Sequence, residues 1–193
     1  MRPIQSMRLI IAITGASGAI YGKRLLEVLR NKKIETHLII SKAAEKIIEY
    51  ELEATKKDIE KLASYVYSVD DLAAPISSGS FKTDAMIIIP CSMKTLAGIA
   101  HGYTENLILR TADVMLKEKR KLILVPRETP LNIIHLRNML ELAKQGVTIV
   151  PAMPAYYHKP KQISDIVDYM VGKVLDCLEI EHRLFKRWSG SSF

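Results

Sequence analysis

Cysteine and aromatic residues are scarce in this chain of 193 residues. The two cysteines, Cys91 and Cys177, cannot form a disulfide framework and lack the spacing of metal ligands. We therefore expect a reducing compartment, the cytoplasm, and no metal site. Aromatic residues make up 6% of the chain, and the basic residues behind its net charge of +7 form only short clusters, such as residues 117–121. A nucleic-acid-binding role is therefore disfavoured, and a solvated basic surface or attraction to phosphorylated small molecules explains the charge more simply.

Long hydrophobic runs are also absent. No apolar run approaches the roughly 20 residues that cross a bilayer, and the start of the chain lacks a signal-peptide cleavage site, so we expect no membrane span. No internal repeat, low-complexity tract or linker divides the chain. With 48% hydrophobic and 25% charged residues, the sequence predicts one globular domain over residues 1–193. Residues 1–6 would be a short extension, and residues 183–193 a tail that is either frayed or packed on a neighbouring subunit.

What the sequence does contain is a strand, a small-residue turn and a helix near its N-terminus. The apolar run of residues 9–13 is short, β-branched and ended by glycine, which favours a strand, and helical spacing follows from residue 20. The turn Gly15-Ala16-Ser17-Gly18 places backbone N–H groups and a hydroxyl at a helix N-terminus, which is suited to phosphate or another anion. An ordinary packing turn is an equally good interpretation of these residues alone.

This turn differs from the dinucleotide-binding fingerprint. Ser17 stands where the second glycine of that pattern belongs. The second predicted strand, residues 35–40, ends in Ser41 and offers no acid to hold a ribose. NAD is therefore disfavoured, and a mononucleotide such as FMN is the better expectation.

Polar residues follow two further predicted strands. Residues 85–90 lead into a turn at residues 91–95, and residues 121–126 lead into Arg127 and Glu128. In an open parallel sheet, ligands bind outside the carboxyl ends of the strands, so these turns favour a shared site. Arginine binds phosphate in a bidentate way, and glutamate can act as a general acid or base. Strands alternate with helices throughout, which predicts a doubly wound parallel α/β sheet of the flavodoxin or Rossmann type.

Two helical segments carry charges with open roles. Over residues 106–119, Arg110, Asp113 and Lys117 form a polar stripe. An exposed ion-pair ladder is the simple interpretation, and a position of Arg110 and Lys117 near a phosphate is the alternative. Glu51 lies with two other glutamates on the helix that Ser41 would cap, where solvent exposure is the usual outcome for any one of them.

Together these segments resemble the UbiX-type flavin prenyltransferases, within the homo-oligomeric flavin-containing decarboxylase-like proteins. The similarity extends over nearly the whole chain, in order and at matching spacing. Its segments are Thr14-Gly15-Ala16-Ser17-Gly18-Ala19, Ile40-Ser41-Lys42-Ala43-Ala44, Ser78-Gly79-Ser80, Pro90-Cys91-Ser92-Met93-Lys94-Thr95, Asn106-Leu107-Ile108-Leu109-Arg110-Thr111-Ala112-Asp113-Val114, Val125-Pro126-Arg127-Glu128-Thr129-Pro130, Ile134-His135-Leu136, Asn138-Met139-Leu140 and Tyr157-His158-Lys159-Pro160.

The resemblance implies a flavodoxin-like subunit in a large homo-oligomer, usually a dodecamer, with FMN at the subunit interfaces. The implied reaction transfers a dimethylallyl group from dimethylallyl monophosphate to reduced FMN without a metal. The product, prenylated FMN, would pass to a decarboxylase of the UbiD type. Whether the donor is a monophosphate or a diphosphate stays open, as do the partner's identity and pathway.

The resemblance also assigns roles to residues of this chain. The residues expected to bind FMN are Gly15, Ala16, Ser17, Ser41, Ser92, Met93, Lys94, Thr95, Arg110 and Arg127. Arg110 is included because the polar stripe could place it near a phosphate. The catalytic assignments are Glu128 as proton donor, Ser17 near the reacting nitrogen, Glu51 lining the site and Lys117 supporting phosphate charge. Tyr157 and Lys173 would bind the phosphate of the donor.

This chain departs from the family pattern at two places. Lys173 stands where many relatives carry arginine, and it keeps the charge but loses the planar fork. Met93 and Lys94 replace smaller residues. Two other functions remain open. The first is an FMN-dependent decarboxylase acting on a cysteinyl substrate, against which the lack of histidine before Thr36 counts. The second is a flavin carrier without chemistry.

Overall fold

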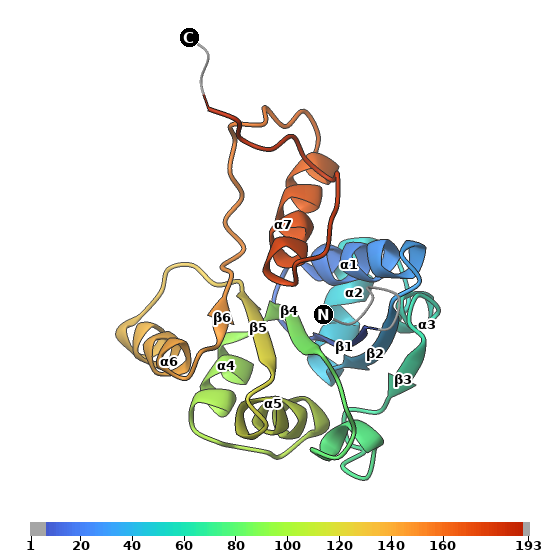
Figure 1. Cartoon of the computed structure of the whole chain (residues 1–193), viewed down its shortest axis with the longest axis vertical. Helices are drawn as coiled ribbons and strands as arrows, with labels where there is room; N and C mark the ends of the chain where they lie inside the picture. The colour runs from blue at the N-terminus through green and yellow to red at the C-terminus, as the bar shows by residue number, and fades with distance from the viewer. Residues whose placement is uncertain (1–6, 191–193) are drawn as a thin grey trace.

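Six parallel strands form one sheet in the computed structural model, which describes residues 7–190 (Figure 1). The strands are β1 (Arg8–Ile13), β2 (Glu35–Ile40), β3 (Tyr65–Tyr67), β4 (Ala85–Cys91), β5 (Lys121–Pro126) and β6 (Thr148–Ile149). Their order is β3-β2-β1-β4-β5-β6, and every neighbouring pair is parallel. The order reverses between β1 and β4, as in doubly wound sheets that bind nucleotides at this switch point. The predicted doubly wound parallel sheet is confirmed.

Helices cover both faces of the sheet, because side chains along a strand alternate between the two faces. On one face lie α1 (Ala19–Asn31), α2 (Lys42–Leu52), α3 (Lys56–Glu60) and α7 (Ile163–Cys177). On the other lie the short helix η2 (Pro75–Ser77) and the helices α4 (Met93–Ala100), α5 (Leu107–Lys117) and α6 (Ile133–Lys144). All seven residues of β4 are buried, which places this strand at the centre as its composition indicates.

The C-terminal segment folds back along α7. The ring of Phe185 lies 4.9 Å from that of Tyr169, and a Cβ at Gly172 would come within 2.5 Å of the Phe185 ring. Glycine at this position therefore makes room for the segment. Within residues 183–190 the tail packs on its own helix, and packing on a neighbouring subunit stays a prediction. The expected extension at residues 1–6, like residues 191–193, lies outside the described residues.

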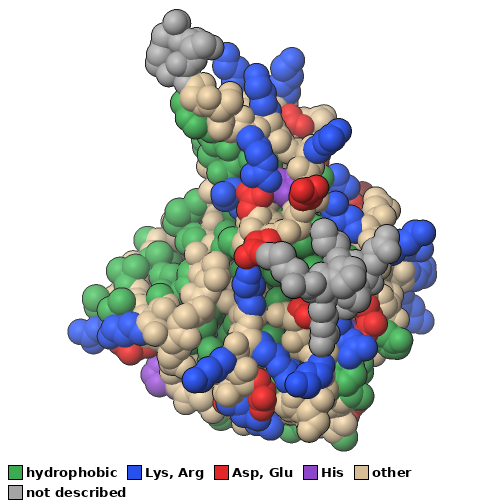
Figure 2. All heavy atoms as spheres, viewed as in Figure 1, with side chains coloured by type: hydrophobic (Ala, Val, Ile, Leu, Met, Phe, Trp, Pro, Cys, Tyr) green, Lys and Arg blue, Asp and Glu red, His purple; other side chains and the backbone are tan. Residues whose placement is uncertain are grey.

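One exposed face of the molecule is apolar. Figure 2 shows hydrophobic side chains gathered on the side where α6 lies. Ile133, Ile134, Leu136 and Leu140 of this helix are each about half exposed or more, and Met153 and Tyr156 are also exposed. A group of neighbouring exposed apolar side chains is typical of an interface with another protein. No helix within residues 7–190 combines the length and the apolar character needed to cross a membrane.

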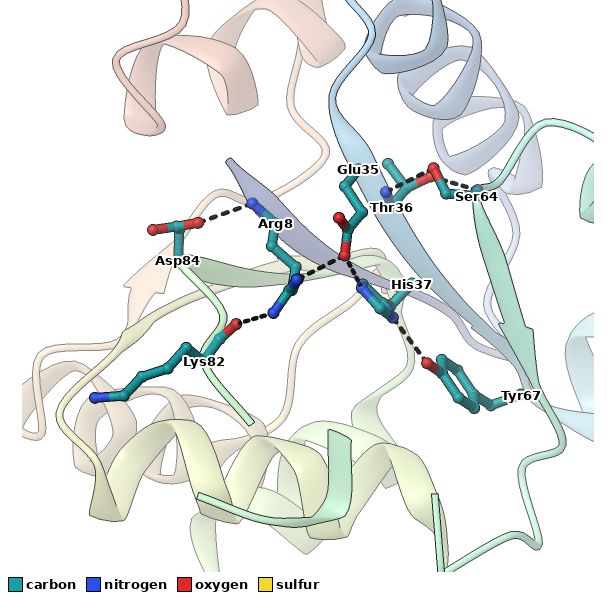
Figure 3. A network of polar contacts seen from close by, with 8 residues as sticks. All are labelled: Arg8, Glu35, Thr36, His37, Ser64, Tyr67, Lys82 and Asp84. Carbon is teal, nitrogen blue, oxygen red and sulfur yellow. Dashed lines mark hydrogen bonds and ion pairs between the residues drawn. The ribbon is translucent and has the colours of Figure 1, made fainter. Parts of the chain in front are cut away.

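A network of polar side chains lies at the amino-terminal edge of the sheet (Figure 3). The imidazole of His37 is buried and bonds Glu35 Oε1 at 2.8 Å and the Tyr67 hydroxyl at 2.9 Å. The Arg8 guanidinium donates to the same Glu35 oxygen at 2.5 Å and to the Lys82 carbonyl oxygen at 3.0 Å. These bonds join β1, β2 and β3 to the segment before β4.

Candidate functional site

A cavity of about 950 Å³ opens at the carboxyl edge of the sheet. This volume lies within the range of small-molecule sites. Its walls come from the turns after β1, β2 and β4 and from the segment between α4 and α5. The residues that line it are Gly15, Ser41, Lys42, Ala43, Val69, Asp70, Ser92, Lys94, Thr95, Gly98, His101, Tyr103, Glu105, Asn106, Ile108 and Leu109.

Two serine hydroxyls at the cavity cap the N-termini of helices. Ser41 Oγ accepts from the Ala44 N–H at 3.1 Å and caps α2, while Ser92 Oγ accepts from the Thr95 N–H at 3.3 Å and caps α4. The positive ends of both helix dipoles therefore lie at the cavity wall, an arrangement that favours an anion. A Cβ at Gly15 would come within 2.5 Å of Ala43 Cβ, so glycine lets the first turn of α2 approach the end of β1.

Thr14 links two of the turns, a role that the sequence analysis did not identify. Its hydroxyl donates to the Pro90 carbonyl oxygen at 2.8 Å and accepts from the Ser92 N–H at 2.8 Å. The side chain is 1% exposed. The paired register of β1 with β4 ends at Ala12 and Ile88, so Thr14 holds the two chain segments together beyond their ladder.

The N-terminus of α1 binds a side-chain carboxylate of the same chain. Glu51 Oε2 accepts from the Gly18 N–H at 2.8 Å and from the Ala19 N–H at 2.9 Å. The predicted turn is therefore present, but two of its N–H groups are occupied by a carboxylate from the end of α2. Glu51 is exposed, as expected for a helix glutamate, yet the bonds place it beside half-buried Ser17, while Ala16 is buried.

Arg127 and Glu128 line a second hollow of about 420 Å³, which lies between the ends of β5 and β6. Both side chains are exposed. The Arg127 N–H bonds the Cys91 carbonyl oxygen at 3.3 Å, which ties the end of β5 to the end of β4. Burial raises the pKa of Tyr21 on α1, and the nearby Arg127 charge opposes that rise. Arg127 therefore faces the first turns of α1.

Arg110 and Lys117 are not among the residues that line the large cavity. Asn106 at the start of α5 lines that cavity, but Lys117 ends the helix, about 16 Å further along at 1.5 Å per residue. Arg110 pairs with Asp113 at 2.9 Å, as the ion-pair interpretation expects, and Lys117 with Glu118 at 2.5 Å. Both cations line a hollow of about 440 Å³ beside the loop of residues 77–80.

Tyr157 and Lys173 form a third group, on α7 and the segment before it. The ring of Tyr157 lies 6.0 Å from that of Tyr169 and meets it edge-on. Lys173 stands four residues after Tyr169, on the same face of the helix. Its ammonium lies 3.6 Å from a carboxylate oxygen of Asp176.

A single chain therefore brings together only part of the predicted set. Five of the expected flavin-binding residues line the large cavity, namely Gly15, Ser41, Ser92, Lys94 and Thr95. Met93, the first residue of α4, is 8% exposed and packs in the core. Sequence reasoning missed the contribution of residues 101–105 to the cavity wall, although Asn106, which caps α5, marked the end of that segment. No group of three or more His, Cys, Asp or Glu side chains within residues 7–190 is placed to hold a metal ion.

Comparison with known proteins places this arrangement in a family. The model of the Flavoprotein family matches residues 1–175. The flavin prenyltransferase UbiX of Methanocaldococcus jannaschii is 55% identical over 182 residues, which cover 94% of this chain and 98% of the relative.

Two solved structures agree with that match. The crystal structure of AnUbiX (PadA1) in complex with FMN and dimethylallyl pyrophosphate is 50% identical, with a TM-score of 0.95 over 97% of this chain and all of the other. A dodecameric FMN-dependent Ubix-like decarboxylase from Escherichia coli O157:H7 is 53% identical, with a TM-score of 0.94 over 95% of this chain and all of the other. The chain belongs to the Flavoprotein family and, within it, to the UbiX-type flavin prenyltransferases.

Proposed function

We propose that this protein transfers a dimethylallyl group from dimethylallyl phosphate to reduced FMN. The single observation that carries this proposal is the cavity of about 950 Å³ at the switch point of the sheet, lined by the turns that match the family motifs. Relatives at 50 to 55% identity support it, because they are flavin prenyltransferases or carry FMN and a dimethylallyl phosphate ester.

The residues of the cavity fit FMN. The hydroxyls of Ser41, Ser92 and Thr95 offer hydrogen bonds, and the capped ends of α2 and α4 favour a phosphate. Lys94 adds a positive charge at the wall. The apolar part of the lining, which includes Val69, Ile108 and Leu109, suits a flat ring system. In the reaction, bound reduced flavin supplies the nucleophilic nitrogen.

The charged residues outside the cavity would serve the prenyl donor. Breaking an allylic carbon–oxygen bond releases an anionic phosphate. Cations stabilise that leaving group, and Lys117, Arg127 and Lys173 are exposed or half-exposed and available to it. Glu128 would donate a proton to the phosphate, and Tyr157 a hydrogen bond. These roles follow from the family motifs that the residues occupy.

The complete site would form between copies of the chain. Lys117 lies at the end of α5 away from the large cavity, and Arg110, near the start of the helix, donates to the Ser77 carbonyl oxygen at 3.1 Å instead of lining that cavity. Another copy of the chain would therefore bring these cations to the flavin. The exposed apolar face of α6 offers an interface for such assembly. The dodecameric relative from Escherichia coli supports a homo-oligomer, and we propose the same assembly here.

Three further parts of the proposal depend on the family. Prenylated FMN would pass to a UbiD-type decarboxylase, and the donor would be the monophosphate. The cysteinyl decarboxylase and the carrier remain less favoured than the transferase. A cytoplasmic location is consistent with Cys91 and Cys177, both of which are free thiols.

The test is anaerobic incubation of the purified protein with reduced FMN and dimethylallyl monophosphate, followed by mass spectrometry of the flavin. We expect a flavin heavier by one five-carbon unit. A parallel reaction with dimethylallyl diphosphate decides between the donors. Unchanged FMN in both reactions contradicts the proposal, and loss of CO₂ from a cysteinyl substrate in a third reaction would favour the decarboxylase instead.

A further inference from the structure

A charged cluster on the last turns of α7 joins Lys173 to Asp176, His182 and Arg187, three residues to which the resemblance assigns no role. Asp176 is at its centre. Arg187 of the C-terminal segment donates to both carboxylate oxygens, at 2.6 and 3.2 Å, and His182 Nε2 lies 3.0 Å from Oδ1. The Lys173 ammonium lies 3.6 Å from Oδ2. One carboxylate therefore meets two full positive charges and an imidazole.

The two cations do not share Asp176 equally. Arg187 presents its planar fork at hydrogen-bonding distance, whereas 3.6 Å exceeds the usual range for an N–H···O bond. Partial burial by itself raises the pKa of Asp176, but bonds from Arg187 and His182 hold that pKa below its ordinary value. Asp176 is therefore a charged and well-occupied acceptor, and Lys173 keeps its three N–H groups available to another anion.

The cluster adjoins the proposed position of the donor phosphate. Lys173 shares a face of α7 with Tyr169, and the Tyr157 ring packs 6.0 Å from Tyr169. The Tyr157 ring also lies 5.7 Å from that of Trp188, the residue after Arg187. Arg187 consequently stands beside the two residues that the family assigns to the phosphate.

We propose that Arg187 and Asp176 are positioning residues that set how strongly Lys173 binds the donor phosphate. By occupying the carboxylate, Arg187 prevents Asp176 from competing with the phosphate for the Lys173 ammonium. This proposal rests on the proposed function. It concerns lysine at position 173 in particular, because the planar fork of an arginine there could serve two oxyanions at once.

A purely structural role makes a different prediction. Arg187 and Asp176 also hold the C-terminal segment on α7, together with Phe185 in the space left by Gly172. If docking of the segment is their only role, removal of either partner should loosen it equally. If competition for Lys173 matters, removal of Arg187 weakens donor binding and removal of Asp176 does not.

The experiment measures KM for dimethylallyl monophosphate and kcat with reduced FMN under anaerobic conditions. As a second readout, calorimetry gives the donor's dissociation constant in the oligomer loaded with oxidised FMN, which does not consume the donor. The variants are Arg187→Ala, Asp176→Asn and the double substitution. We expect Arg187→Ala to raise KM about two- to fivefold, the range of a half-exposed ion pair, with little change in kcat. Asp176→Asn should leave KM at or below that of the parent protein, and the double variant should recover the parent value.

Two matched variants complete the design. Arg183→Ala removes an exposed arginine from the same segment and should leave KM unchanged. In a Lys173→Met background, Arg187→Ala should add no further increase. A double variant as impaired as Arg187→Ala overturns the proposal, as does an unchanged KM in Arg187→Ala. Failure of the parent protein to form prenylated flavin would instead overturn the proposed function.

Discussion

At the amino-terminal edge of the sheet, the polar side chains of Arg8, Glu35 and His37 bond to one another and to Tyr67 (Figure 3). At the carboxyl edge, Ser41 and Ser92 cap helices and also line a cavity, where the Ser92 hydroxyl donates to Thr95 Oγ1 at 3.0 Å. Both edges are polar and partly buried. They differ in whether their hydrogen-bonding capacity is used up inside the chain.

This difference separates structural polar residues from candidate binding residues. Buried polar groups are nearly always paired, so a closed network such as that of His37 stabilises the fold and leaves little for a ligand. Helix ends and hydroxyls that open onto a cavity keep donors available. Glu51 shows that position alone is not sufficient, because it satisfies two N–H groups at an otherwise suitable helix N-terminus.

The largest effect should come from Glu128 at the carboxyl edge. We expect Glu128→Gln to lower kcat by about 10²- to 10⁴-fold, the usual contribution of a positioned general acid, while FMN affinity is retained. Quench-flow or steady-state measurement of prenylated flavin, with FMN titration alongside, tests both parts. Glu60→Gln, at a glutamate that pairs with Lys56 on α3, is the control and should leave kcat and FMN affinity unchanged. Parent-like turnover of Glu128→Gln would remove Glu128 from the mechanism.

Substitution of Thr14 should lower both the stability of the fold and the affinity for FMN. Thr14→Val keeps the shape but removes the acceptor of the Ser92 N–H, which should cost about 1–3 kcal/mol of stability. The Pro90 carbonyl oxygen loses the hydroxyl but keeps its bond from the Thr14 N–H at 3.2 Å. FMN affinity should fall as well, because Thr14 positions the turn that carries Ser92. Denaturant unfolding and FMN titration measure the two, and Thr14→Ser should restore both. Loss of stability with unchanged FMN affinity would separate Thr14 from the site.

His37 offers the matching experiment at the closed edge. His37→Phe removes bonds to Glu35 and Tyr67 and should also cost about 1–3 kcal/mol of stability. In contrast to Thr14→Val, it should leave FMN affinity and kcat/KM unchanged once the protein is folded. Thermal unfolding and flavin titration of the two variants side by side give the comparison. A fall in FMN affinity in His37→Phe would show that the two edges are coupled.

The sheet was predictable from the sequence because its signals are local. Buried strands such as residues 9–13 are short runs rich in β-branched residues, and Ser41 lies directly before a helix that it caps. The turns at the carboxyl edge could also be predicted, since parallel topology brings strand ends together. Thr14 and Glu51 could not, because their partners lie 78 and 32 to 33 residues away and depend on the register of packed elements.

The distribution of the charged site residues was beyond pattern reasoning for another reason. The spacing of Arg110 and Lys117 identifies a helix face but not which end of the sheet it serves, and α5 carries Lys117 away from the cavity. A single chain contains no local signal for contacts that another copy would supply. Likewise, Gly172 makes room for the Phe185 ring only because the C-terminal segment folds back along α7, and no local pattern in the sequence indicates that contact.

The smallest expected effect is a pH dependence at the closed edge. Burial lowers the pKa of His37 despite its bond to Glu35, so the unfolded chain takes up this proton first, near its ordinary value of about 6.5. The contribution of His37 to stability is therefore complete above about pH 6.5 and declines as the pH falls towards its lower folded pKa.

Denaturant unfolding of the parent protein and of His37→Phe at pH 7.5, 6.5 and 5.5 tests this dependence. The parent should lose stability more steeply on acidification, by less than about 1.4 kcal/mol per pH unit for one proton, and His37→Phe should lack that part. The Glu35 carboxyl should not contribute to the difference between pH 5.5 and 7.5, because, despite burial, bonds from His37 and Arg8 hold its pKa below the ordinary value of a glutamate. Equal slopes would mean that the buried imidazole titrates as it does in water. FMN affinity should respond to pH identically in both proteins, because the His37 network lies at the edge opposite the cavity.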